Sequence, residues 1–320
     1  MTSVRNKWLI SSRSTTLLLL IITIFVIMSA IKGSLFYSSK NLSSIFSNLS
    51  YDMLLACGMT FVLILGGIDL SVGSVLAFTG IVVTTLLRNG ESIAFAIGLG
   101  LLVSMLIGTT NGLLVSVFNI APFIATLAMM SVFRGMSYVM TSGYFVVGLP
   151  EVYSSIARGS LLGISNKIII SVGIMAILSF LSIKHVSIRR MFYVGNNYNA
   201  AFLSGISARK TTILGYMICS ILAGIAGILI TSSFDMGQAS FGVGYEMRAI
   251  SAAVIGGASM SGGEGDFIGT ALGVILVALV NNVFIMFNGS PNWSTAISGI
   301  MLIVAVALDI LRSKRRPQGI

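Results

Sequence analysis

The residue types that usually carry out catalysis are scarce in this sequence. It holds one histidine, His185, so no HExxH zinc site can form. No GxSxG nucleophile elbow is present, and no lysine follows a glycine-rich loop in the Walker A pattern. The two cysteines, Cys57 and Cys219, lie in apolar runs without a CxxC partner, as small core residues do. We therefore expect a protein that is not an enzyme, with no catalytic, metal or cofactor site.

Polar residues inside apolar runs are the remaining candidates for function. Asp69 and Arg134 are charged, and charged groups within a membrane usually face a bundle interior or a cavity. Asp69 also suits the N-cap of a helix that begins near Ser71, which is the role we favour. Arg134 could bind free carbonyls of a neighbouring helix or contact a ligand. The amides of Asn111, Asn281 and Asn282 are expected to form hydrogen bonds between helices.

The composition shows what kind of elements must position these residues. Of 320 residues, 56% are hydrophobic and 9% are charged, whereas soluble domains carry about 25% charged residues. These figures exclude a disordered chain, a coiled coil, a disulfide scaffold and an ordinary cytosolic enzyme. A net charge of +10 would suggest nucleic acid in a soluble chain, but basic residues also gather in cytoplasmic loops of membrane proteins. At roughly 20 residues per crossing, the length allows about ten membrane helices.

Apolar stretches of suitable length occur along the whole chain. The first, Ser14–Ile31, lacks a small-x-small cleavage site and is interpreted as a retained helix rather than a signal peptide. The eighth, 246–258, is too short to cross a bilayer unless it borrows flanking residues. The sequence thus predicts an all-α polytopic membrane protein with spans at about 14–31, 42–66, 71–87, 92–118, 121–141, 167–184, 211–231, 246–258, 267–287 and 294–310.

Basic residues between these stretches predict the orientation. The region 184–210 contains Lys and Arg but no acidic residue, and the basic N-terminus and C-terminal tail resemble it. Six expected spans separate the N-terminus from this region, and four more lead to the tail. Even numbers place all three basic segments on one side, which the positive-inside rule assigns to the cytoplasm. We therefore expect one transmembrane domain over 1–320, with 1–13, 185–210 and 311–320 in the cytoplasm.

Two windows without any charged residue, 92–133 and 267–308, share an order of features. The first holds Ile107-Gly108-Thr109 and then Pro122, and the second holds Ile268-Gly269-Thr270 and then Pro291. Each proline suits the first turn of a new helix, because it has no N–H to donate. The Ile-Gly-Thr match alone could be coincidence in apolar sequence. Because the two windows cross the membrane in opposite directions, however, we expect two inverted five-helix halves.

Glycine-rich segments at 66–74 and 256–265 interrupt apolar runs. Irregular backbone at membrane depth persists only where protein or water satisfies its polar groups. Both segments could therefore line or gate a cavity. They could also be short loops between helices, which composition alone slightly favours.

Four segments, taken in order, match one known family. They are LGGIDLSVGSVLAFTG (65–80), NGLLVSVFNIAPFIATLAMMSVFRGMSYVMTSG (111–143), YVGNNYNAAFLSGISARKTT (193–212) and GVGYEMRAISAAVIGGASMSGGEGDFIGT (242–270). Together they resemble membrane permeases of bacterial ATP-binding-cassette sugar importers, in the ribose-type branch. The resemblance covers the chain from about Leu42 to the C-terminus.

The resemblance implies a ten-helix permease in the bacterial cytoplasmic (inner) membrane. It implies partners as well: a second permease subunit, identical or different, cytoplasmic ATPase subunits and an extracytoplasmic sugar-binding protein. ATP and Mg²⁺ would bind to the ATPase, and nucleic acid is not an expected partner. Sugar would move inward by alternating access as the two halves rock about a central path. Ribose, another pentose, a hexose, a furanose and a signalling sugar all fit this implication.

The segment 193–212 resembles the part of these permeases that couples to the ATPase. Its Leu-Ser-Gly-Ile run at 203–206 matches the family. Asn199 stands where the family has a glutamate, and Phe202 where it has an arginine. This change puts ionic contacts with the ATPase in doubt, but not docking. The resemblance assigns coupling to Asn199, Ala200, Ala201, Leu203, Ser204, Gly205 and Ile206.

A neutral sugar gains little from charged groups and must also leave easily, so short polar side chains and backbone suit its path. Two outer loops, 142–166 and 232–245, are expected to receive the binding protein, although their polar residues beside aromatics suit any solvated loop. Candidates for docking are Glu151 and Asp235. Candidates at or near the path or gate are Asp69, Ser71, Asn111, Thr126 and Arg134.

A stand-alone secondary transporter or channel for a small polar solute is the alternative. Proton-coupled transporters usually carry several ionisable groups within the membrane. Here the acidic residues near the spans, among them Asp52, Asp69 and Glu246, are few. This set is thin for a proton relay, and the alternative is therefore disfavoured.

Overall fold

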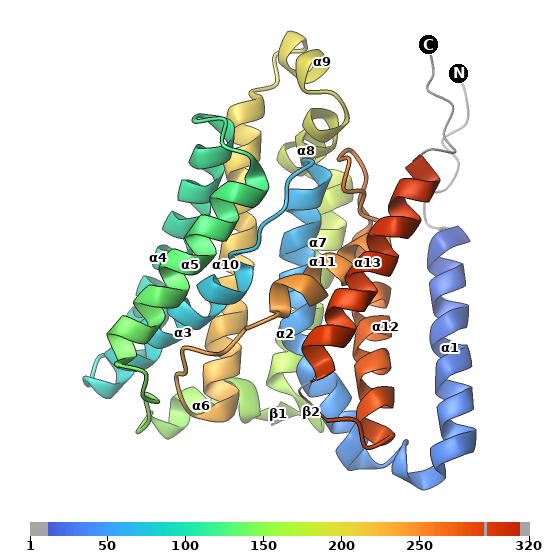
Figure 1. The fold of residues 1–320 in the computed structure, drawn as a ribbon. Helices are drawn as coiled ribbons and strands as arrows, with labels where there is room; N and C mark the ends of the chain where they lie inside the picture. The colour runs from blue at the N-terminus through green and yellow to red at the C-terminus, as the bar shows by residue number, and fades with distance from the viewer. Residues whose placement is uncertain (1–11, 291–292, 314–320) are drawn as a thin grey trace.

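Long helices run side by side in the computed structural model, which describes residues 12–290 and 293–313 (Figure 1). Each predicted stretch corresponds to a helix whose ends lie within about three residues of the predicted ones, because hydropathy reports where a chain meets lipid. The all-α fold is thus confirmed. The helices are α1 (Ser12–Lys32), α2 (Ser39–Ile64), α3 (Val72–Arg88), α4 (Ile93–Ser116), α5 (Pro122–Thr141), α7 (Asn166–Lys184), α10 (Ala208–Phe234), α11 (Tyr245–Gly256), α12 (Phe267–Met286) and α13 (Ser294–Ser313).

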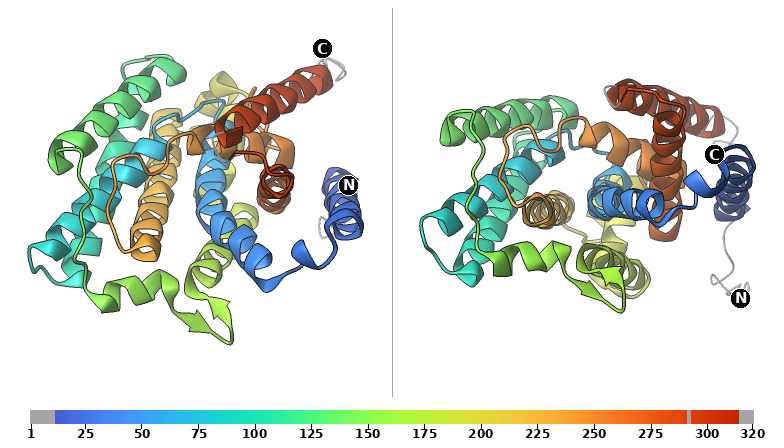
Figure 2. Two further views of the ribbon diagram at one scale, coloured as in Figure 1. Left: turned by 60° about the horizontal axis from the view of Figure 1, so that its bottom comes forward. Right: turned by 90° about the horizontal axis from the view of Figure 1, so that it is seen from below.

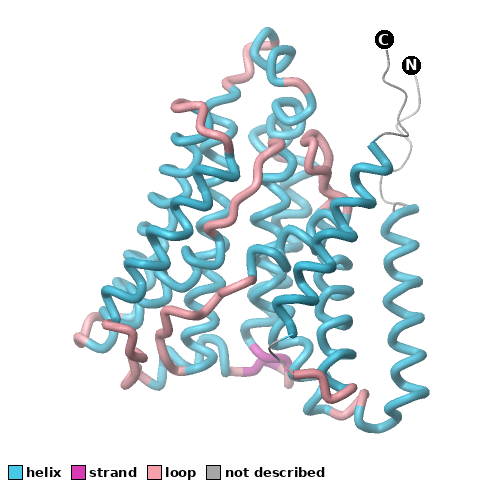
Figure 3. Tube along the Cα trace, in the orientation of Figure 1, coloured by secondary structure: helices cyan, strands magenta, loops and turns pink. Residues whose placement is uncertain are grey.

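Two of these helices are shorter than the rest. Within the described residues, 8 helices are long and apolar enough to cross a membrane, whereas α3 has 17 residues and α11 has 12. Both short helices begin about midway along the bundle, after non-helical segments at 65–71 and 235–244 (Figure 1). Figure 3 shows these two segments entering the bundle. Of the expected outer loop 232–245, residues up to Phe234 belong to α10, Gly237 pairs with Val146 of the other outer segment, and the chain then turns inward to α11.

Short elements occupy regions that were expected to be loops. They are η1 (Gly33–Leu35), α6 (Glu151–Arg158), the antiparallel strands β1 (Ser160–Leu161) and β2 (Ile164–Ser165), α8 (Val186–Asn196) and α9 (Tyr198–Leu203). In α8, Ile188, Met191 and Val194 are buried, and their spacing of three residues keeps them on one helical face. Low mean hydropathy hid this periodicity, so the region 185–210 was not predicted to be helical.

The core of the bundle is formed by α2 and α10. In α2, 89% of the most apolar 18-residue window is buried, against 11% in α7, which leaves most of α7 for contact with lipid. Viewed along the bundle, α2 and α10 lie in the middle, α5 and α13 on one side, and α7 on the opposite side (Figure 2). Cys57 on α2 and Cys219 on α10 are buried in this core, as predicted.

The features that suggested a repeat lie at different places in their helices. Gly108 is in the second half of α4 and packs against α10, whereas Gly269 is in the first turn of α12 and packs against Gly256 of α11. The two Ile-Gly-Thr tripeptides are therefore not structural equivalents. Pro122 opens α5 in its first turn, as predicted. Pro291 lies outside the described residues.

The two ends of the bundle carry different elements. The start of α1, the end of α13 and the helices α8 and α9 lie at one end, and α6 with the β1–β2 hairpin lies at the other (Figure 1). We call these the α9 end and the α6 end. The described chain therefore enters, leaves and presents the predicted coupling segment at a single end.

Candidate functional site

Asp69 holds the turn that leads into the half-length helix α3. Its Oδ1 accepts hydrogen bonds from the backbone N–H of Ser71 at 2.9 Å and from the Ser71 hydroxyl at 2.6 Å. The first N–H groups of a helix have no partner within it, and the helix dipole favours a negative charge there. Because Asp69 and Ser71 are fully buried, protein groups must supply that partner. The N-cap residue of α3 is Ser71, whose side chain makes no capping hydrogen bond, so Asp69 orders the turn before α3 rather than serving as the predicted N-cap.

Asn111 on α4 and Thr126 on α5 hold the same segment from the side. Asn111 Nδ2 donates to Ser71 Oγ at 2.9 Å and lies 3.5 Å from Asp69 Oδ2. Thr126 Oγ1 accepts a hydrogen bond from the Leu70 N–H at 3.1 Å. Four of the five predicted path residues thus form one cluster at the break before α3. All four are buried, so in this arrangement they position the break rather than face an open path.

Arg134 on α5, the fifth of these residues, lies at the other break. Its guanidinium donates to the carbonyl oxygens of Ala239 and Phe241, the second at 2.7 Å. Both carbonyls belong to the non-helical segment 235–244 and have no place in a helical ladder. Of the two roles considered for Arg134, the binding of free carbonyls is therefore the one observed.

The two breaks meet where α3 and α11 begin. A Cβ atom on Gly73 would overlap the carbonyl oxygen of Gly242 and would lie 2.8 Å from Glu246 Oε2. Gly242 and Gly244 have φ angles of +73° and +79°, which glycine adopts readily. The starts of two half-length helices therefore abut inside the bundle. The second break was not predicted, although the Gly-Val-Gly run at 242–244 is a signal that could have revealed it.

An ion pair lies one turn into α11. Arg248 Nη1 is 3.3 Å from Asp52 Oδ2 on α2, and the two side chains are 14% and 8% exposed. The guanidinium also lies over the ring of Tyr245, 3.7 Å from its centroid. Sequence reasoning missed this pair, because the two charges are far apart along the chain. Both interrupt apolar runs, and their opposite signs are the available signal.

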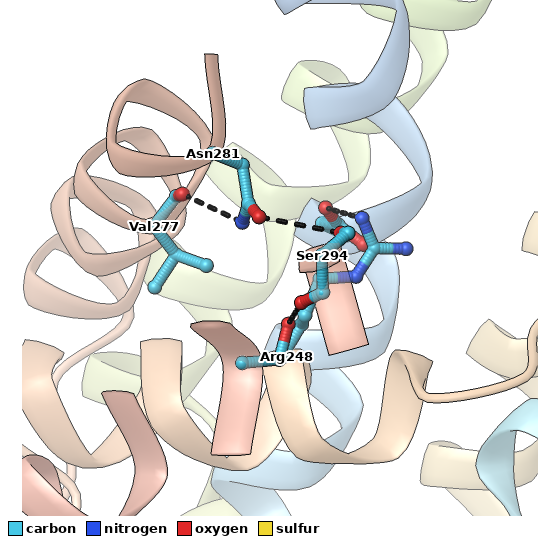
Figure 4. A network of polar contacts seen from close by, with 6 residues as sticks. Arg248, Val277, Asn281 and Ser294 are labelled. Carbon is cyan, nitrogen blue, oxygen red and sulfur yellow. Dashed lines mark hydrogen bonds and ion pairs between the residues drawn. The ribbon is translucent and has the colours of Figure 1, made fainter. Parts of the chain in front are cut away.

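The asparagines predicted to bond between helices do so. Asn281 Oδ1 on α12 accepts a hydrogen bond from Ser294 Oγ on α13 at 3.2 Å, close to Arg248 (Figure 4). Asn282 on α12 and Asn41 on α2 exchange amide hydrogen bonds of 2.7 and 3.4 Å. With the bond from Asn111 to Ser71, these contacts join α4 to the start of α3, α12 to α13, and α12 to the distant helix α2.

The predicted coupling residues form the tip of the α9 end. Asn197 caps α9 by accepting a hydrogen bond from the Ala200 N–H at 2.9 Å. Ala201 faces inward, whereas Phe202 and Leu203 are 68% and 84% exposed. Gly205 ends the turn with a φ angle of +76°. The segment therefore presents apolar side chains outward on a short capped helix.

A hollow of about 360 Å³ lies beside this tip. None of its lining residues is charged, although basic residues flank it in sequence at 189–190 and 209–210. The lining residues are Tyr193, Asn196, Asn197, Ala200, Ala201, Ser204 and Ile206.

The predicted docking residues at the α6 end have different surroundings. Glu151, the first residue of α6, is exposed. Asp235 is half-buried, has a φ angle of +58° and accepts a hydrogen bond from Ser154 Oγ on α6. An antiparallel bridge between Val146 and Gly237 joins the two outer segments nearby. Asp235 thus attaches α6 to the end of α10, and Glu151 is the candidate whose charge faces outward.

A metal site requires several ligating side chains close together. Within residues 12–290 and 293–313, no three His, Cys, Asp or Glu side chains are grouped so that they could hold a metal ion. The single histidine, His185, lies between α7 and α8 and is exposed. The polar clusters described above are therefore built from hydrogen bonds and one ion pair.

Comparison with known proteins agrees with the fold and with the sequence motifs. Residues 41–306 match the family described as "Branched-chain amino acid transport system / permease component". The chain is 37% identical to the ribose import permease protein of Bacillus subtilis (strain 168) over 292 residues, which cover 91% of each chain. It is 33% identical to the ribose import permease protein of Escherichia coli (strain K12) over 309 residues, 95% of each chain. It is 34% identical to the D-allose transport system permease protein of the same strain over 297 residues, 91% of each chain. The chain therefore belongs to the family of ATP-binding-cassette transporter permeases, in its ribose-type branch of sugar permeases.

Proposed function

We propose that this chain is the permease subunit that moves a neutral monosaccharide, or a related small sugar, inward across the bacterial inner membrane. The observation that carries the proposal is similarity over nearly the whole length to permeases named for ribose and D-allose. A further relative, 32% identical over 281 residues, is named for L-arabinose. Pentoses and hexoses are neutral polyols, which suits a bundle whose polar groups are mostly short side chains and backbone.

The helices support a count of ten spans in two inverted halves. The segments 65–71 and 235–244 complete the crossings that α3 and α11 begin only midway. Packing is also paired across the bundle, since α4 packs on α10 and α12 packs on α2, while α5 packs on α3 and α13 on α11. Half-length helices at the interface of inverted repeats are typical of transporters. The halves would be α1–α5 and α7 with α10–α13.

The charges support a cytoplasmic location for the α9 end and hence for both termini. The described basic residues at this end include Lys184, Arg189, Arg190, Arg209 and Lys210. An excess of Lys and Arg marks cytoplasmic loops. The α6 end would then face the binding protein, with Glu151 as a contact.

A second permease subunit would complete the path. Only 17% and 18% of the most apolar windows of α5 and α13 are buried, and both helices lie on one side of the bundle (Figure 2). In space, both breaks lie between these two helices (Figure 1). A partner on this face, identical or different, would place two pairs of breaks around one central path. Alternating access would then open that path to each side in turn.

The energy would come from ATPase subunits at the α9 end. ATP and Mg²⁺ would bind to those subunits, and α9 would be the element that they move. Phe202 and Leu203 are exposed there, so the contact would be largely apolar rather than ionic.

Reconstitution in liposomes tests the proposal. The chain is purified with its ATPase partner, and uptake of labelled ribose, L-arabinose and D-allose is followed with the sugar-binding protein outside and ATP inside. We expect uptake of at least one sugar that needs both proteins and ATP. The control is a vesicle with the permease alone. Solute movement in that control, without ATPase, would instead support a stand-alone transporter or channel and would overturn the proposal.

A further inference from the structure

Three distant segments of the chain meet next to α9, and glycine occupies the contact in each of them. Gly66 follows the end of α2, Gly195 lies in the last turn of α8, and Gly262 and Gly263 lie in the loop between α11 and α12. We call the contact of these four residues the glycine junction. It lies at the α9 end, between the predicted coupling segment and the rest of the bundle.

The backbones in the glycine junction touch directly. A Cβ atom on Gly195 would overlap the carbonyl oxygen of Ile64 and would lie 2.8 Å from the backbone nitrogen of Gly263. A Cβ atom on Gly262 would lie 2.7 Å from the carbonyl oxygen of Gly195. The Gly263 N–H also donates a hydrogen bond of 2.8 Å to the carbonyl of Ile64. A side chain at Gly195 or Gly262 would run into main-chain atoms of another segment, whereas a Cβ atom on Gly66 would meet nothing closer than 3.8 Å. The segments are therefore held against one another mainly through the backbone at Gly195 and Gly262.

On one side, the glycine junction continues into the coupling segment. Gly195 is followed two residues later by Asn197, which caps α9. Val194 and Ala201 are buried together with Ala208, and Leu65 packs against this cluster. The α8–α9 unit therefore rests on the end of α2 through its backbone and through apolar side chains.

On its other side, the glycine junction is connected to two further parts of the bundle. The first is the break ahead of α3, because Ile64 is only five residues before Asp69 in the chain. The second is α13, because the Met260 N–H donates to Asp309 Oδ2 on that helix at 3.1 Å. Asp266, three residues after Gly263, caps α12 by accepting a hydrogen bond from the Ile268 N–H at 3.0 Å.

Where two segments touch through their backbones, a displacement of one segment is passed almost fully to the other. A long side chain can absorb a shift by changing rotamer, whereas closely packed main chain cannot. We propose that the glycine junction is the mechanical link that carries displacement of α8–α9 to the break before α3 and to α12 and α13, and that its segments move as one body. This inference rests on the proposed function, in which an ATPase moves α9. Gly66, Gly195, Gly262 and Gly263 are thus positioning residues for transport.

The first test replaces Gly195 by alanine. Gly195→Ala must displace Ile64 from α8, so we expect the permease–ATPase complex to assemble and hydrolyse ATP while sugar transported per ATP falls about tenfold. The matched control is Gly173→Ala, since a Cβ atom on that helical glycine of α7 meets nothing within 4 Å. Equal transport per ATP in Gly195→Ala, Gly173→Ala and the wild type would overturn the proposal. This ratio separates coupling from a loss of folded protein.

The second test does not depend on how well Gly195→Ala folds. The Cβ position of Gly263 lies 3.1 Å from Asn196 Cβ, a little closer than the spacing of about 3.8 Å in disulfides. We expect the pair Asn196→Cys and Gly263→Cys to crosslink on oxidation, and the crosslinked protein to transport as fast as its reduced form. Failure to crosslink would contradict the contact. Loss of transport on oxidation, restored by reduction, would show that the segments separate during the cycle and would overturn the proposal.

The two proposals fail in different ways. If the wild-type complex shows no ATP-dependent uptake, the proposed function fails before any variant is compared. If the wild type is ATP-dependent but the variants give the overturning results above, only the glycine junction fails.

Discussion

The carboxylate of Asp52 on α2 lies 3.3 Å from the guanidinium of Arg248 on α11, inside the bundle. This ion pair joins the core helix α2 to the short helix α11. Burial withdraws both charges from water, so each needs the other as a partner. The pair therefore fixes where α11 lies against α2.

Removing one member of this pair should destabilise the fold strongly. Arg248→Leu leaves the Asp52 carboxylate buried without a cation, and such a change typically costs about 3–5 kcal/mol. The double variant Asp52→Leu/Arg248→Leu removes both charges and should recover much of that loss. Thermal unfolding in detergent measures the effect, with Lys210→Met on the exposed surface as the control. A single variant as stable as the control would show that the pair contributes little.

The turn before α3 gives a milder and more local prediction. Asp69→Ala removes the acceptor for the Ser71 N–H and hydroxyl, and leaving a buried donor unsatisfied costs about 1–3 kcal/mol. Asp69→Asn keeps a side-chain oxygen at the same position and should retain most of the stability. Thermal unfolding and uptake of both variants check this. Equal losses in the two variants would mean that the charge, rather than the acceptor, is what matters.

Most of the membrane helices could be predicted, because a lipid-facing helix must be apolar along its whole length. The depth at which a helix begins could not be predicted in this way. Hydropathy shows that the apolar sequence is interrupted at 235–244. It does not show whether this interruption lies at the membrane surface or inside the bundle. The segment reaches the interior because Arg134, from another helix, binds its carbonyls.

In the candidate site too, contacts between residues close in sequence could be predicted, whereas contacts that depend on helix packing could not. The bond from Asp69 to Ser71 spans two residues, so the sequence could place Asp69 at the start of α3, although it predicted an N-cap and not a bond to the residue before the helix. Asn111 and Thr126 reach this turn from α4 and α5, and their contacts depend on how those helices pack. Glycine spacing alone did not indicate which glycines meet. Gly195 meets Gly262 only through the folded arrangement of α8 and the loop after α11.

At the α6 end, the structure distinguishes two acidic residues. Glu151→Lys reverses an exposed charge and should raise the binding-protein concentration needed for half-maximal uptake, with no change in thermal stability. Asp235→Asn is the comparison, since asparagine tolerates its left-handed φ angle and can still accept from Ser154. We expect Asp235→Asn to behave like the wild type. An unchanged half-maximal concentration for Glu151→Lys would remove this residue from the docking surface.

The tip of the α9 end should not tolerate a change in its backbone. Gly205 has a φ angle of +76°, and its N–H donates to the Phe202 carbonyl at 3.0 Å. Proline fixes φ near −65° and has no N–H, so Gly205→Pro should distort the end of α9. We expect loss of binding-protein-stimulated ATP hydrolysis and of uptake, in protein that still inserts in the membrane. If both activities persist, the 193–212 segment is not the coupling element.

Arg134 should control the order of the second break. Arg134→Ala leaves the carbonyls of Ala239 and Phe241 without this donor, and an unsatisfied buried group costs about 1–3 kcal/mol. The segment 235–244 should therefore open more often, which hydrogen exchange with mass spectrometry detects as faster exchange of its amides. Arg134→Lys should give an intermediate rate, because both bonds come from Nη1 alone and a lysine ammonium can still donate, but it is more strongly hydrated than a guanidinium. Arg209→Ala, at the exposed α9 end, should leave exchange in 235–244 unchanged. If Arg134→Ala also leaves it unchanged, the guanidinium does not hold the break, and its contacts with the two carbonyls are incidental to the position of α11.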